Sequence, residues 1–81
     1  MARVLLFGPL RDLAGWRERV LDPAPASLFA LRAQLAAEDP DLGEALAGKG
    51  VQIALDQALV RGDAAIRPGA EVAFLPPMSG G

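Results

Sequence analysis

The sequence contains no cysteine and no histidine. Without cysteine, the chain forms no disulfide and has no thiol nucleophile of its own. Without histidine, it lacks the commonest general base near neutral pH and a preferred ligand of zinc and copper. We therefore expect no transition-metal site and no nucleophilic triad, and we predict that the side chains of this protein are poorly equipped to catalyse a reaction alone.

Basic charge and long apolar runs are also scarce. Lys49 is the only lysine, the arginines are scattered, and the net charge is −2. Nucleic-acid-binding domains usually cluster lysine and arginine, so this composition argues against that class. The apolar run at residues 4–7 is too short to cross a membrane and ends at Gly8-Pro9 without a cleavage site of small residues. We expect a cytoplasmic protein that binds neither nucleic acid nor membranes.

The apolar residues that are present predict one small domain with several strands. The chain has 81 residues, of which 52% are hydrophobic, and this length is typical of a single domain. Short apolar runs that end at glycine or proline predict strands. The expected strands are residues 2–7, 17–22, 51–55, 58–60 and 71–75. The charges within residues 17–22 favour an edge strand.

One long helix is expected to begin after Ser27, whose hydroxyl is a good N-cap. A buried stripe at helical spacing follows, formed by Leu28, Leu31 and Leu35. The helix should end near Asp39, because the residue before Pro40 is disfavoured in α geometry. A helical turn is expected at residues 10–15, and residues 40–50 should be mainly loop with a short helical turn near 42–46.

This order of elements predicts an α+β protein. Two strands, one main helix and three further strands match the plan of the ubiquitin-like β-grasp, with the helix on one face of a mixed sheet of four to five strands. We expect the domain to comprise residues 1–75. Residues 76–81 should form an extended C-terminal tail.

The tail sequence Pro-Pro-Met-Ser-Gly-Gly suggests the chemistry of the protein. Prolines favour an extended course, and six residues at about 3.1–3.5 Å each reach about 20 Å. Gly80 and Gly81 have no side chains, so they can enter a narrow channel and leave the terminal carbonyl open to attack. An α-carboxylate, with an ordinary pKa of roughly 3.5, is ionised at neutral pH and is a poor electrophile. We expect a partner that uses ATP to activate Gly81 as an acyl-adenylate.

The last eight residues, 74–81, resemble the C-terminus of the small subunit of molybdopterin synthase. The resemblance continues through Phe7, residues 10–15, 54–60 and 68–74, and so covers nearly the whole chain. Two positions depart from the common pattern, with Asp56 in place of the more usual Asn and Ala70 in place of the common Asp. The terminal octapeptide is the specific part of this resemblance.

The resemblance implies a sulfur carrier that holds a thiocarboxylate on Gly81 for formation of the molybdopterin dithiolene. Its implied partners are an adenylating enzyme, a sulfur-donating sulfurtransferase and the large synthase subunit, with two small and two large subunits in a heterotetramer. The chain would be part of an enzyme only as this small subunit, with no permanently bound cofactor. The residues expected to contact partners are Phe7, Leu59, Leu75, Pro76, Pro77, Met78 and Ser79.

Several alternatives remain open from the sequence. Phe7, Leu59 and Leu75 are equally compatible with an ordinary core. The chain is also compatible with a sulfur carrier for thiamin or another thiolation pathway, or with a ubiquitin-like modifier attached to lysines through Gly81. The remaining alternative is an interaction domain with an inert tail, because chain ends are often poorly ordered.

Overall fold

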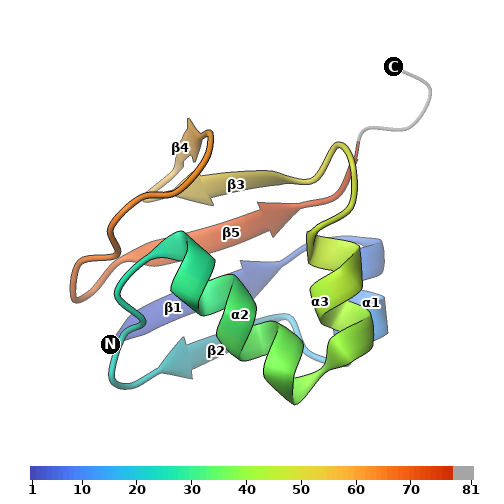
Figure 1. Ribbon diagram of the computed structural model, residues 1–81, viewed down its shortest axis with the longest axis horizontal. Helices are drawn as coiled ribbons and strands as arrows, with labels where there is room; N and C mark the ends of the chain where they lie inside the picture. Colours follow the sequence, from blue (N-terminus) through green and yellow to red (C-terminus); the bar gives the residue numbers. More distant parts are fainter. Residues whose placement is uncertain (78–81) are drawn as a thin grey trace.

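A five-stranded β-sheet forms the centre of the structure, a computed structural model that describes residues 1–77 (Figure 1). The strands are β1 (Ala2–Leu6), β2 (Glu18–Leu21), β3 (Gln52–Leu55), β4 (Ala58–Val60) and β5 (Glu71–Leu75). Their order is β2-β1-β5-β3-β4, with β1 parallel to β5 and the other neighbours antiparallel. The predicted α+β class and mixed sheet are confirmed, in the arrangement of the ubiquitin-like β-grasp.

The first strand ends one residue earlier than the sequence predicts. It ends at Leu6 because Gly8 adopts a φ of 57° and a helix begins at Pro9, which turns the chain away from the sheet. Phe7 therefore lies just outside β1. The strands predicted at residues 17–22 and 51–55 form as β2 and β3 without residues 17, 22 and 51. The predicted edge position of β2 is confirmed.

A two-residue turn joins β3 to β4, as the sequence predicts. Asp56 and Gln57 have φ values of 50° and 70°, the left-handed geometry that two-residue hairpins require. The Asp56 carboxylate also accepts a hydrogen bond from the Glu71 backbone N–H at 2.9 Å, while the Asp56 N–H donates to the Glu71 carbonyl at 2.8 Å. Asp56, one of the departures from the family pattern, thus links the hairpin to the start of β5.

The main helix, α2 (Leu28–Glu38), has the predicted start and end. The Ser27 hydroxyl accepts a hydrogen bond from the Ala30 N–H at 3.1 Å, which satisfies one unpaired donor of the first turn. The predicted stripe of leucines is buried. Figure 1 shows α2 lying across one face of the sheet. Within residues 1–77, no helix combines the length and apolar character needed to cross a bilayer.

Residues 40–50 contain more helix than expected. The α3 helix (Pro40–Leu46) occupies the segment predicted to be mainly loop. Proline is favourable at the first helical position, where its missing N–H would have no partner. The Asp39 carboxylate caps the helix by accepting a hydrogen bond from the Leu42 N–H at 3.2 Å. Burial of Leu42 and Leu46 then fixes α3 against the core. The shorter α1 (Pro9–Ala14) confirms the first predicted turn.

The core lies between the helices and one face of the sheet. Its largest fully buried side chains are Phe74, Leu6, Leu28, Leu31, Leu35, Leu42, Val4 and Val72. Because side chains alternate along a strand, the residues between these core positions point to the opposite face. Figure 1 shows α2 and α3 on the same side of the sheet, so no helix within residues 1–77 covers the opposite face.

The close contact between α2 and α3 predicts a sensitive position at Gly43. A Cβ atom built on Gly43 would lie 2.7 Å from the Ala36 Cα, so one helix must move. We expect Gly43→Ala to lower the free energy of unfolding by about 1–3 kcal/mol, the usual range for overpacking, as measured by urea denaturation. The same substitution in an Ala36→Gly background should cost less. Stabilisation by Gly43→Ala, as helix propensity alone suggests, would contradict this contact.

Candidate functional site

Two loops hold the residues that follow β5. A Cβ atom built on Gly8 would lie 3.1 Å from Cγ of Pro76, and one built on Gly50 would lie 3.0 Å from Cβ of Pro77. Both glycines have positive φ, 57° and 90°, which disfavours other residues there. The loop after β1 and the loop before β3 therefore direct the chain as it leaves the sheet. The sequence did not suggest a role for these glycines, because each glycine and the proline near it are far apart in the sequence.

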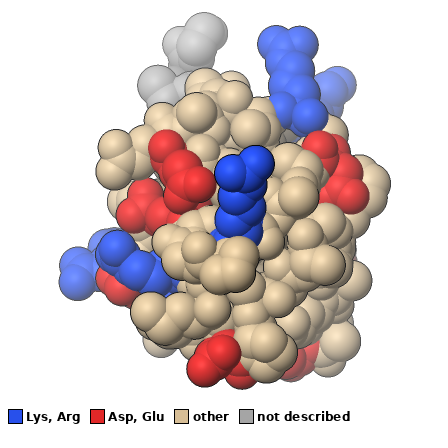
Figure 2. All heavy atoms as spheres, turned by 90° about the vertical axis from the view of Figure 1, so that its left-hand side faces the viewer, with Lys and Arg blue, Asp and Glu red and all other residues tan. Residues whose placement is uncertain are grey.

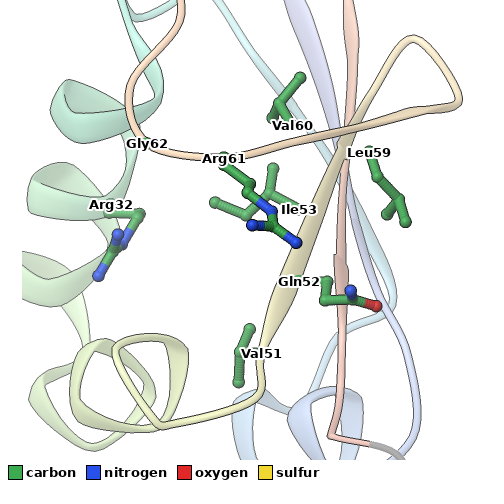
Figure 3. A pocket seen from close by; sticks show the side chains of 8 residues that line it. All are labelled: Arg32, Val51, Gln52, Ile53, Leu59, Val60, Arg61 and Gly62. Carbon is green, nitrogen blue, oxygen red and sulfur yellow. The ribbon is translucent and has the colours of Figure 1, made fainter.

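The sheet face opposite the helices, here called the open face, carries Leu59, one of the predicted contact residues. One line across it consists of Leu5, Ala73, Ala54 and Leu59, in the order that the strand register pairs them. In Figure 3, Leu59 extends from β4 on the side of β3 away from α2. Leu59 is exposed, Leu5 and Ala54 are half-buried and Ala73 is buried. The line is therefore apolar through four adjacent strands and is most exposed at Leu59, and exposed apolar side chains of this kind can serve protein binding.

Phe7 and Leu59 do not belong to the core. Their side chains are 43% and 60% exposed, which excludes the alternative of ordinary core positions for these two residues. Leu75 is half-buried and pairs with Gln52 of β3. Phe7 and Leu75 directly follow the paired residues Leu6 and Phe74, so the structure places both at the end of the sheet from which the tail leaves. Their contact with a partner stays a prediction.

Charged side chains border the open face next to its apolar line. The Arg3 guanidinium lies 3.1 Å from a Glu18 carboxylate oxygen and 3.7 Å from one of Glu71. All three residues are at least partly exposed, so each pair adds little stability. Figure 2 shows the neighbouring side of the molecule, at the left of Figure 1, where basic and acidic side chains are also interspersed. An apolar centre with a polar rim is the usual composition of a protein interface.

The remaining predicted site residues lie outside the described part of the chain. These residues are Met78, Ser79, Gly80 and Gly81. Pro76 is half-buried and Pro77 is exposed, both directly after the last residue of β5. The boundary between a domain of residues 1–75 and a tail of residues 76–81 stays a prediction, as does the role of Gly81.

The fold and the open face define a protein of the ubiquitin-like β-grasp class. Residues 4–81 match the ThiS family, and the chain belongs to this family. It is 35% identical to the molybdopterin synthase sulfur carrier subunit of Escherichia coli and 33% identical to that of Haemophilus influenzae, with 100% of each chain covered. These matches confirm the resemblance found in the sequence.

A solved structure supports the fold independently. The crystal structure of SAMP1 from Haloferax volcanii aligns with a TM-score of 0.83 and 24% identity, covering 99% of this chain and 98% of that chain. At this identity the likeness establishes the fold alone. It places the strand order and the single main helix within an architecture already observed by experiment.

Proposed function

We propose that the protein is the sulfur carrier subunit of a molybdopterin synthase and that its working group is the carboxylate of Gly81. The observation that carries the proposal is the match over the full length of two molybdopterin synthase sulfur carrier subunits. The Gly-Gly sequence at residues 80–81 agrees with it. So does the absence of histidine and cysteine from the chain, which leaves the acid–base work to a partner.

The proposed chemistry begins with activation of the carboxylate by an adenylating enzyme. A carboxylate oxygen of Gly81 attacks the α-phosphorus of ATP, pyrophosphate leaves and an acyl-adenylate forms. A persulfide sulfur of the donor enzyme then attacks the acyl carbon, and AMP leaves. A thiol of the donor then attacks the donor's sulfur in the resulting acyl disulfide, which forms a disulfide on the donor and releases the thiocarboxylate. This chain contributes only the reacting acyl group, so the partner must exclude water and stabilise the developing charge.

The described residues support delivery of that group. Gly8 and Gly50 lie close to the two prolines, which leaves no room for larger residues there and favours one direction for the chain as it leaves the sheet. The open face lies beside this point and offers an apolar surface for the large synthase subunit or the adenylating enzyme. ATP is consumed by the activating partner, and no cofactor stays on the chain. We place the whole process in the cytoplasm.

Intact-mass analysis tests the proposal. The protein is incubated with ATP, its adenylating enzyme and a sulfur donor, and its mass is then measured without reducing the sample. The expected result is the mass gain of replacing one oxygen by one sulfur, assigned to Gly81 by fragmentation. Omission of ATP is the matched control, because the free carboxylate should not react. Isopeptide-linked conjugates without any thiocarboxylate would instead assign the chain as a modifier.

Complementation separates the molybdenum pathway from other sulfur pathways. The proposed function requires that the gene restore molybdopterin synthesis in a strain that lacks its own carrier subunit. Rescue of a thiamin-requiring strain alone would assign the carrier to the thiamin pathway. A Gly81 deletion is the matched control in both strains, because it leaves residues 1–77 unchanged.

A further inference from the structure

A charged hollow lies between α2 and the β3–β4 hairpin, on the side of the sheet that faces the helices. It has a volume of about 500 Å³ and includes two arginines, Arg32 of α2 and Arg61 directly after β4. Figure 3 shows both arginines bordering the space, with Val51 and Ile53 beside it. The hollow therefore combines two positive charges with partly buried apolar side chains.

The two arginines are available for an external acid. Within residues 1–77, the ion pairs involve Arg3, Arg11 and Arg19, and none involves Arg32 or Arg61. This is notable in an acidic chain, whose net charge is −2. Arg32 is half-buried beside apolar side chains, which reduces solvent screening of its charge, whereas Arg61 is exposed. Guanidinium groups bind carboxylates in a two-pronged geometry, so a carboxylate is a suitable ligand.

A second hollow adjoins the first at Arg32. It has a volume of about 420 Å³ and lies over the contact between α2 and α3. Apart from Arg32, its lining residues are Phe29, Ala33, Ala36, Gly43 and Ala47. Phe29 is 55% exposed, and the Arg32 guanidinium carbon lies 6.0 Å from its ring centroid. This surface suits an apolar side chain placed next to a negative charge.

We propose that the two hollows form one docking groove, here called the Arg32 groove, for an acidic peptide segment of a partner protein. A carboxylate of the segment lies between Arg32 and Arg61, and an apolar side chain packs beside Phe29. An extended segment fits better than a free phosphate, because the second hollow is shallow and mostly apolar. The groove reaches the β4 edge at Leu59, which also lies on the open face. Peptide binding is independent of the proposed sulfur chemistry.

An NMR titration tests the proposal with the full chain labelled with ¹⁵N. The probe is the peptide acetyl-Asp-Glu-Leu-Phe-Asp-Glu-amide. Amide shifts should concentrate at Phe29, Arg32, Ile53, Arg61 and Gly62. The double variant Arg32→Ala/Arg61→Ala should raise the Kd by at least about tenfold, the effect of losing two partly screened charge contacts. An unchanged spectrum of the free variant outside the groove establishes that it is folded.

Matched controls separate docking in the groove from general charge attraction. Arg17→Ala/Arg67→Ala removes the same charge from two other arginines that form no ion pair within residues 1–77, and should change the Kd less than about twofold. A peptide with Asn and Gln in place of Asp and Glu should bind at least about tenfold more weakly. The proposal is overturned if both double variants weaken binding of the acidic peptide equally. It is also overturned if the neutral peptide binds as tightly as the acidic one, or if the acidic peptide does not bind. Displacement of the peptide by an equal concentration of inorganic phosphate would reassign the groove to small anions.

Discussion

Deletion of Gly81 should lower the rate of molybdopterin formation by more than about 100-fold, because a 1 Å misplacement of a reacting group can already cost that factor and one extended residue spans about 3.5 Å. The shortened chain still ends in a glycine carboxylate, Gly80, so its intrinsic reactivity is unchanged and only its reach is reduced. The rate is measured with the reconstituted synthase, the adenylating enzyme, ATP and a sulfur donor.

Two further variants complete this experiment: one is a control for the length of the tail, and the other tests whether Gly81 must be the last residue. Ser79→Gly keeps the length of the tail and should retain the rate within about twofold, because it alters no reacting atom. An uncleavable phenylalanine added after Gly81 should abolish activity, because it displaces the reacting carboxylate and adds a bulky side chain to a thin tail. All variants should match the parent chain in urea denaturation. Full activity of the extended chain would remove the basis for assigning the chemistry to Gly81.

The sheet and the main helix were predictable because their signals are local. Ser27 and Pro40 mark the ends of α2, and the spacing of its leucines identifies its buried face. Asp56-Gln57 specifies the hairpin in the same way. The full length of α3 could not be predicted, because the glycines within residues 40–50 favour a loop. Its stability depends on two features that composition does not reveal, namely the Asp39 cap and the burial of Leu42.

The candidate site was predictable only in part. The Gly-Gly sequence and the resemblance identified the tail, and alternation along the first strand already placed Leu5 and Phe7 on one face. The small residues Ala54 and Ala73 complete the apolar line only through the register of β3 and β5, which no local pattern specifies. The close approach of Pro77 to Gly50 likewise depends on two segments far apart in the chain. Position in space, rather than residue type, brings these residues together.

A charge at Leu59 should separate partner binding from folding. Leu59 is 60% exposed, so Leu59→Asp should change the free energy of unfolding by no more than about 0.5 kcal/mol. If the open face binds the large synthase subunit, the same substitution places an unpaired charge in an apolar interface. We expect the Kd for that subunit to rise roughly 100-fold, equivalent to about 2.7 kcal/mol. Calorimetry measures the Kd, and urea denaturation measures the stability.

Leu13→Asp is the matched control for this substitution. Leu13 is 48% exposed but belongs to α1, whose main contacts are with α3. The Leu13→Asp substitution introduces the same charge at a position of similar exposure, and it should change the Kd less than about threefold. Phe7→Ala should weaken binding by roughly tenfold, as is typical of an aromatic contact residue. If Leu59→Asp and Leu13→Asp weaken binding equally, the effect comes from net charge and the open face is not the binding surface.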